Sequence, residues 1–212
     1  MGIFFRFIRT DCKKISSSVA ENGLLEIKVP TDVTNEDFNK YINSLGAAKY
    51  AEIADKQKKS KEAFRKYTKK IIDKYADEFG LDFGISLQLR EKTNKLNDCR
   101  IELNGMVFEG KMLFGIPIQY MPDDVVESII RYTVYLLAIE YETRWSEIHS
   151  FTVGTGRFPD MDSFTEKSAP VSEEAKYRIT IPKAKIDKMA AEYNKAVKKY
   201  NAEMQKAPIG SF

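Results

Sequence analysis

The feature that most constrains the fold of this chain is a polar gap within a long predicted helix. Residues 47–79 have the composition of a helix, but Asp55–Glu62 (DKQKKSKE) contains no apolar residue. A helix without apolar residues over about two turns has nothing to bury there. We therefore expect this segment to project into solvent or to lie against a polar partner, as the exposed tip of an anchored helix.

The second half of this helix carries the apolar stripe that would anchor it. The stripe consists of residues at helical spacing, namely Phe64, Tyr67, Ile71, Tyr75 and Phe79. This spacing predicts that the second half packs on the body of the protein, whereas the half around Lys56–Lys61 does not. A continuous helix over 47–79 would extend for about 50 Å, which is longer than a domain of this size needs.

Several strands are predicted before and after this helix. Their apolar patterns lie at Ile3–Ile8, Leu24–Val29, Ile85–Arg90, Lys111–Tyr120 and Tyr177–Ile181. Two alternating runs around Asn104-Gly105 predict a β-hairpin with a tight type I′ turn. Pro117 indicates that its strand lies at a sheet edge or contains a bulge.

Three further helices complete the expected fold. Thr34 and Asp37 resemble a capping box and predict a short helix that ends near Gly46. A proline and two acidic residues open a helix over 123–148, which is apolar nearly all round and is expected to be buried. With a last helix at 183–206, the sequence predicts an α+β fold with a mainly antiparallel sheet, a buried central helix and two long basic helices.

The same patterns predict the domain organisation. We expect residues 1–182 to form an α+β domain that includes the long projecting helix and an extended loop at 149–174. Residues 183–212 are expected to form a separate heptad-patterned helix and tail.

Charge is distributed unevenly along the chain. The sequence contains 34 Lys and Arg against 31 Asp and Glu, which gives a net charge of +3. Residues 49–74 have a local net charge of +6 and residues 183–206 one of +4, which leaves −7 for the rest. Basic helices on an acidic body would steer the protein onto nucleic acid or onto an acidic protein surface. The alternative is a solvated lysine surface that binds nothing.

The long basic helix is the strongest candidate site. Its cationic residues are Lys58, Lys59, Lys61, Arg65, Lys66, Lys69 and Lys70. Lysines are point charges that contact phosphates without reading the base sequence. Binding of nucleic acid at this site is therefore expected to be nonspecific and sensitive to salt.

The last helix carries a second candidate surface. Its apolar residues step by four and three positions in a heptad pattern, namely Ile186, Ala190, Tyr193, Val197, Tyr200 and Met204. Seams of this kind pair helices in coiled coils. Two interpretations remain open, packing of the helix on its own domain and pairing with another subunit as a partner interface.

Few residues point to catalysis. The two cysteines, Cys12 and Cys99, and the one histidine, His149, form no metal-binding or nucleophile motif. We therefore predict no catalytic residue, no metal site and no cofactor. The Ser-, Thr-, Gly- and Pro-containing loop at 149–174 would hold the site if the protein were an enzyme, which is the third hypothesis.

No segment predicts secretion or membrane insertion. The start MGIFFRFIR is interrupted by Arg6 and is too short for a signal-peptide core. The apolar stretch Val134–Ile139 is far shorter than a membrane span. We expect a soluble protein, located in the cytoplasm or in an assembled particle, without a membrane partner.

Two functional hypotheses follow from these patterns. The leading one is a non-enzymatic interaction or assembly protein whose partners are other protein subunits, of the same or a different kind, such as a structural component of a viral or phage particle. The alternative is a nonspecific nucleic-acid-binding protein that uses the Lys-rich helix.

Overall fold

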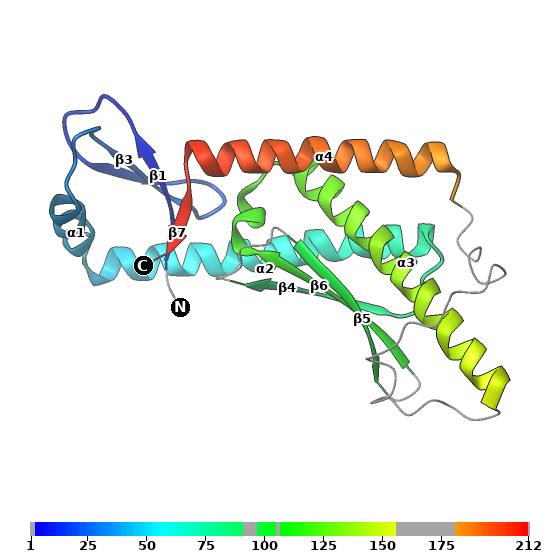
Figure 1. Cartoon of the computed structure of the whole chain (residues 1–212). Helices are drawn as coiled ribbons and strands as arrows, with labels where there is room; N and C mark the ends of the chain where they lie inside the picture. Colours follow the sequence, from blue (N-terminus) through cyan, green and yellow to red (C-terminus); the bar gives the residue numbers. More distant parts are fainter. Residues whose placement is uncertain (1–2, 91–96, 105–106, 156–180, 212) are drawn as a thin grey trace.

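The fold is a mixed α+β arrangement of two lobes bridged by long helices (Figure 1). The computed structural model describes residues 3–90, 97–104, 107–155 and 181–211, of which 97–98, 103–104, 107 and 144–155 are described by their backbone alone. The first elements are β1 (Phe4–Arg9), β2 (Ser16–Val19), β3 (Leu25–Val29), α1 (Asn35–Ser44) and α2 (Gly46–Glu78). They are followed by β4 (Gly84–Arg90), β5 (Asn97–Asn104), β6 (Val107–Gly115), the 3₁₀ helix η1 (Ile116–Tyr120), α3 (Asp123–Thr155), α4 (Lys183–Lys206) and β7 (Ile209–Ser211).

The described strands form two separate sheets, and each sheet contains both parallel and antiparallel strand pairs. The first sheet has the order β2-β3-β1-β7, in which β1 is parallel to β3 and antiparallel to β7. The second sheet has the order β4-β6-β5, in which β4 is parallel to β6 and β5 is antiparallel to it. The predicted α+β class is confirmed. The expectation of one mainly antiparallel sheet is corrected to two mixed sheets, each with a parallel pair. The local patterns did not indicate these pairs, because they join strands that are not consecutive in the sequence.

Most predicted helices and strands are present with small shifts at their ends. The predicted cap is confirmed at Thr34, whose Oγ1 accepts a hydrogen bond from the Asp37 backbone N–H at 3.1 Å. The hairpin pairing is confirmed by the antiparallel register of β5 and β6, which pairs Asn104 with Val107. Because Asn104 is itself paired in the strands, it does not occupy the turn position that the predicted Asn104-Gly105 turn requires; residues 105–106 lie outside the described residues.

Other predicted boundaries need correction. β6 continues from the hairpin to Gly115, and Pro117 lies in η1 and not in an edge strand. α3 extends to Thr155, so that the first residues of the predicted loop 149–174 are helical. The remainder of that loop and most of the predicted strand Tyr177–Ile181 lie outside the described residues.

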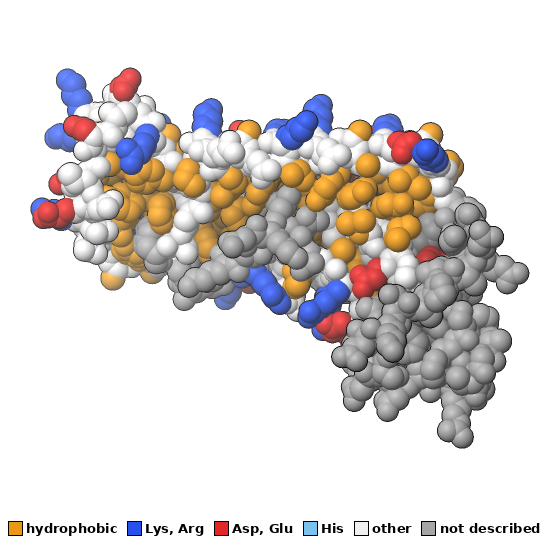
Figure 2. All heavy atoms as spheres, in the orientation of Figure 1, with side chains coloured by type: hydrophobic (Ala, Val, Ile, Leu, Met, Phe, Trp, Pro, Cys, Tyr) orange, Lys and Arg blue, Asp and Glu red, His pale blue; other side chains and the backbone are white. Residues whose placement is uncertain are grey.

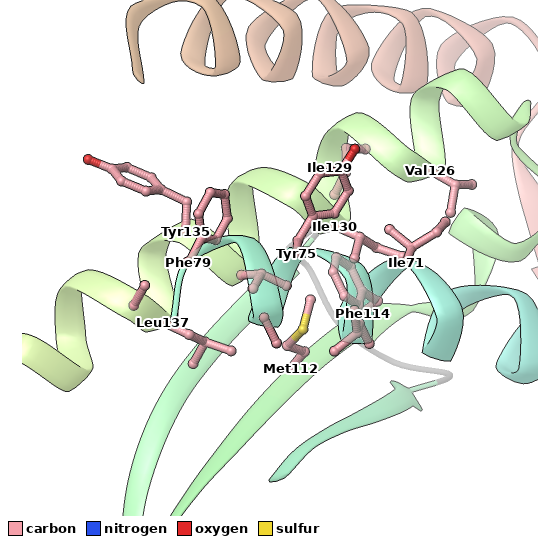
Figure 3. Packing of buried hydrophobic residues seen from close by; sticks show 14 of the residues in the cluster. Ile71, Tyr75, Phe79, Met112, Phe114, Val126, Ile129, Ile130, Tyr135 and Leu137 are labelled. Carbon is pink, nitrogen blue, oxygen red and sulfur yellow. The ribbon is translucent and has the colours of Figure 1, made fainter. Parts of the chain in front are cut away.

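In the larger core, α2 and α3 pack against the second sheet, and α4 packs on α3. Figure 3 shows Ile71 and Tyr75 of α2 beside Ile130 of α3, with Met112 and Phe114 of β6 beneath them. Met112, Phe114 and Ile130 are less than 1% exposed. Complete burial of such side chains stabilises the folded state by about 1.5–3 kcal/mol each, so this core is the main source of stability.

A smaller core fills the first lobe, and α2 contributes to it as well. Its fully buried members come from β3 and from the first part of α2, with Ile27 and Ile53 both at 0% exposure. α2 therefore enters one core at Ile53 and the other at Phe64. The polar gap Asp55–Glu62 is the stretch of helix that crosses between the two cores.

The crossing is held by the side-chain amide of Gln57. Its Oε1 accepts a hydrogen bond from the Phe4 backbone N–H at 3.0 Å, and its Nε2 donates to the Phe4 carbonyl at 2.7 Å and to the Gly23 carbonyl at 3.1 Å. Gln57 is only 7% exposed. The interpretation of the gap as an exposed tip is therefore wrong at this residue, and its other alternative, contact with a polar partner, is the one observed.

Gly23 permits α2 to approach the first sheet this closely. Its φ angle is +80°, a left-handed conformation that favours glycine. A Cβ atom at this position would lie 3.1 Å from the Gln57 backbone N and from the Lys56 carbonyl O. A larger residue would therefore strain the turn and push the helix away from β1.

A polar cluster ties the three long helices together at the edge of the larger core. The Tyr75 hydroxyl donates a hydrogen bond to Glu127 Oε1 at 2.7 Å, and Lys74 Nζ lies 3.1 Å from the same oxygen. The bond from Tyr75, followed by that from Lys74, holds the pKa of Glu127 below its ordinary value. Arg131 lies over the Tyr75 ring and donates from Nη1 to Glu192 of α4 at 3.1 Å.

We predict that Gln57→Met lowers the free energy of unfolding by about 2–4 kcal/mol. Methionine has a similar volume but leaves the buried polar groups of Phe4 and Gly23 without partners, which costs about 1–3 kcal/mol for each group. Urea unfolding measures the change. Lys66→Met, at an exposed position of the same helix, is the control and should change stability by less than about 0.5 kcal/mol. Equal stability of the two variants would contradict the role of Gln57.

We also predict that acidification removes the contribution of Glu127 to stability. Its folded-state pKa lies below its unfolded value near 4.5, so the contribution is present above about pH 4.5 and is lost as the pH falls through the folded-state pKa. Glu127→Gln should therefore destabilise the protein at neutral pH and have less effect near pH 3. The difference should stay below about 1 kcal/mol, because the side chain is 40% exposed. Equal losses in urea unfolding at both pH values would argue against this linkage.

Candidate functional site

The seven predicted phosphate-contacting residues share the solvent-facing side of α2. This surface, the α2 basic face, consists of Lys58, Lys59, Lys61, Arg65, Lys66, Lys69 and Lys70; all are exposed except Lys61, which is half-buried. The opposite side of the helix carries the buried stripe from Gln57 to Tyr75. At 3.6 residues per turn the seven positions spread over about half of the helix circumference, with Lys61 at the edge next to the buried stripe and Lys70 on the opposite side of the helix.

Five cations of the α2 basic face have no ion-pair partner among the described residues. Lys59 is paired with Asp55 at 2.7 Å and Lys69 with Asp73 at 2.9 Å. The hydrogen bond that Lys59 donates to the Asp55 carboxylate raises the pKa of Lys59. The five others are Lys58, Lys61, Arg65, Lys66 and Lys70. From first to last they extend over about 18 Å of helix axis.

The aromatic residues of α2 do not belong to the basic face. Phe64 is 8% exposed and Tyr67 is half-buried against the larger core. This agrees with their position on the apolar stripe. The face therefore offers charges to a ligand without an aromatic surface for base stacking, and contacts to phosphates are the chemistry it supports.

A small cavity lies at the N-terminal end of the α2 basic face, where α2, β1 and η1 meet. Its volume is about 30 Å³. The residues that line it are Phe4, Ala54, Gln57, Lys58, Lys61, Ile116, Gln119 and Tyr120. Two cations of the basic face thus border a cavity whose other walls are mostly apolar. The sequence patterns did not indicate this cavity, because its walls come from three distant segments.

Tyr120 is the most unusual residue of this cavity. The residue is 6% exposed, and its hydroxyl has no hydrogen-bond partner in the described part of the chain. Burial raises the pKa of Tyr120 well above its ordinary value, so the hydroxyl keeps its proton and remains a donor. The sequence placed Tyr120 at the end of a predicted strand and gave no signal of this environment.

An open groove of about 750 Å³ lies beside α2 and adjoins the α2 basic face at Lys59. Its lining includes Lys56 and Lys59, but also Glu21 and Asp123. The two carboxylates offset the two cations, so the groove has no excess of positive charge. It is therefore less suited to a polyanion than the α2 basic face.

The predicted heptad residues of α4 have a partner within the chain. α4 packs antiparallel on α3, with Tyr193 stacked on Tyr132 at a ring distance of 4.5 Å and Lys199 paired with Asp124 at 3.0 Å. Ala196 and Tyr200 are buried. The remaining seam positions are partly buried, namely Ile186, Ala190, Tyr193, Val197 and Met204. The seam is occupied in this structure by intramolecular packing, and pairing with another subunit stays a prediction.

Residues that could hold a metal ion are not clustered in the described part of the chain. Among the side chains described, no group of three or more His, Cys, Asp or Glu lies close enough for coordination. The side chain of His149 lies outside the described set. None of the described helices combines the length and the apolar composition that a bilayer crossing requires.

Comparison with known proteins adds no functional information. No protein-family model matches the chain, and neither the curated proteins nor the solved structures include a match. We therefore infer function from the geometry of the described residues.

Proposed function

We propose that this protein is a non-enzymatic binding protein that holds nucleic acid on the α2 basic face without sequence preference. The observation that carries the proposal is the presence on α2 of five cations, within about half of the helix circumference, that have no ion-pair partner among the described residues. Cations that are already paired contribute little to the binding of an anion, whereas unpaired ones displace counterions from phosphates. In this proposal α2 and α4 are the two long basic helices that the sequence predicts, and α2 is the one that binds the ligand.

The rigidity of α2 supports this choice of ligand. The helix is fixed on both sides of the crossing by Ile53 in one core and Phe64 in the other. Its cations therefore keep regular spacings over about 18 Å, and little backbone order has to be gained on binding. Phosphates repeat regularly along a nucleic acid strand, so a polymer can contact several of these cations at once.

The chemistry of the side chains predicts weak sequence discrimination. Four of the five unpaired cations are lysines, and Arg65 is the exception. Lysine lacks the planar fork that reads guanine by two parallel hydrogen bonds. Affinity should therefore depend on ionic strength far more than on base sequence.

We predict that the triple variant Arg65→Gln, Lys66→Gln, Lys70→Gln binds nucleic acid at least about tenfold more weakly at low salt. The slope of log affinity against log salt concentration for single-stranded DNA should become shallower by about two, since each lost phosphate contact removes about 0.7. Fluorescence anisotropy with a labelled strand over a salt series measures both quantities.

A charge-matched control comes from α4. Lys195→Gln, Lys198→Gln and Lys206→Gln remove the same net charge from exposed positions of the other basic helix. This variant should retain most of the salt slope. Equal losses in both triple variants would show that net charge, and not the α2 basic face, determines binding. Absence of binding by the unmodified protein at low salt would overturn the proposal.

A second candidate function is assembly with protein subunits, for example as a structural component of a viral or phage particle. Figure 2 shows a broad band of hydrophobic side chains on the face below α4. On α3, Leu136 is 36% and Ile139 is 44% exposed, which is high for large aliphatic residues. Exposed apolar patches of this kind often mark protein interfaces.

We predict that, if this second function holds, the protein forms species larger than the monomer at high concentration. The double variant Leu136→Lys, Ile139→Lys should shift the light-scattering mass towards the monomer, because charged side chains oppose burial at an interface. A monomeric mass for the unmodified protein at every concentration would exclude self-assembly through this face.

A further inference from the structure

The hydroxyl of Tyr120 is buried and has no hydrogen-bond partner in the described part of the chain. Tyr120 is 94% buried, since its exposed fraction is 6%, and its hydroxyl oxygen contacts no described donor or acceptor. More than about nine in ten buried polar groups in proteins have a partner. A tyrosine at this site is thus unfavourable for stability when compared with phenylalanine, unless something enters the cavity that it lines.

The polar groups around the cavity are suited to an anion. Lys58 and Lys61 are among the residues that line it, and neither forms an ion pair with a described residue. The side-chain amide of Gln119, which is 8% exposed, forms no hydrogen bond to another described residue. Together with the Tyr120 hydroxyl, these side chains offer N–H and O–H donors from two elements. An acceptor-rich anion would satisfy them simultaneously.

The size of the cavity restricts that anion to a compact group. A volume of about 30 Å³ corresponds to about two water positions. A nucleobase or a sugar is too large for this space, whereas the oxygens at the end of a phosphate are not. A phosphate within a strand carries a sugar on each side and would be blocked at the entrance. A phosphate at the end of a strand has one side free.

The position of the cavity relates it to the α2 basic face. Lys58 and Lys61 are the first unpaired cations of that face and also border the cavity. The other cations without an ion-pair partner among the described residues, Arg65, Lys66 and Lys70, follow along the helix and around it, so that Lys70 lies on the side opposite Lys61. A strand whose end lies in the cavity would have its following phosphates along the helix.

We propose that this cavity receives the terminal phosphate of a nucleic acid strand that lies along the α2 basic face. The inference rests on the proposed function and adds to it a preference for phosphorylated ends. A terminal phosphate carries about −1.5 to −2 charges at neutral pH and offers three acceptor oxygens, more than a phosphate within the strand. Lys58 and Lys61 balance this charge, while Tyr120 donates to an oxygen inside the cavity.

The test compares three forms of one short single strand, with a 5′-phosphate, with a 3′-phosphate and with hydroxyls at both ends. We expect one phosphorylated form to bind about tenfold more tightly than the hydroxyl form, as an additional charge-assisted contact would produce. Inorganic phosphate at constant ionic strength should compete away this preference, which distinguishes the cavity from the rest of the basic face. Fluorescence anisotropy measures each affinity.

Two variants show whether the preference arises in the cavity. In Tyr120→Phe, the affinities for the phosphorylated strand and for the hydroxyl strand should differ by no more than about twofold. The melting temperature of this variant should stay the same or rise, because the lost hydroxyl has no partner in the described chain. Lys70→Gln, at the far end of the basic face, should weaken binding of all three strands and leave their ratio unchanged.

The outcomes separate this inference from the proposed function. Equal affinity for the three strands, with binding intact, would overturn the terminal-phosphate site and leave nucleic acid binding in place. An undiminished preference in Tyr120→Phe, in a protein that melts as the unmodified one does, would also overturn the site. Absence of binding by all three strands at low salt would overturn both proposals.

Discussion

The contact of Gln57 with the backbone of β1 and of the turn at Gly23 determines how the two lobes are joined. A helix that passes closely over a sheet buries backbone N–H and C=O groups, which must find partners. An apolar residue at the crossing would leave these groups unsatisfied, and a charged one would require its own counter-ion. An amide can donate and accept at once, and it does so here with both backbone groups of Phe4. Gln57 is thus a requirement of the crossing, whereas most of the other residues of the polar gap face solvent, as the sequence predicts.

The same crossing places the candidate site at the junction of the lobes. α2 is held from both sides, so the surface opposite the cores presents its cations at fixed positions. The cavity lies where η1 approaches β1 without filling all of the space beside α2. A junction between two cores is a common place for imperfect packing, because side chains there serve two neighbours. The exposed cations of α2 and the cavity thus both lie where α2 crosses between the two lobes.

Local patterns predicted much of this fold because several elements are encoded locally. α2 and α4 follow from apolar spacing, and the cap at Thr34 follows from the adjacent residues alone. β7 was not predicted, because Ile209–Ser211 becomes a strand only through its pairing with β1. The parallel pairs were missed for the same reason, since they join segments that are distant in sequence.

The candidate site was predicted in part for similar reasons. The cations of the α2 basic face are visible in the sequence as a run of lysines, and helical periodicity separates them from the stripe that contains Phe64. The burial of Gln57 was not predictable, because a glutamine among lysines resembles any other solvated residue. Tyr120 was missed because the burial of its hydroxyl depends on three segments that meet only in the folded chain.

The pairing of β7 with β1 has a consequence for the order of folding. Phe4 is paired with Ser211, at a sequence separation close to the length of the chain. Closing such a long loop is entropically unfavourable until the intervening segments are themselves compact. The first sheet should therefore gain its fourth strand as one of the last events in folding, after α4 has docked on α3 and brought β7 to its partner. Hydrogen exchange of the β7 amides would then depend on whether α4 stays docked on α3, and not only on the stability of the first lobe.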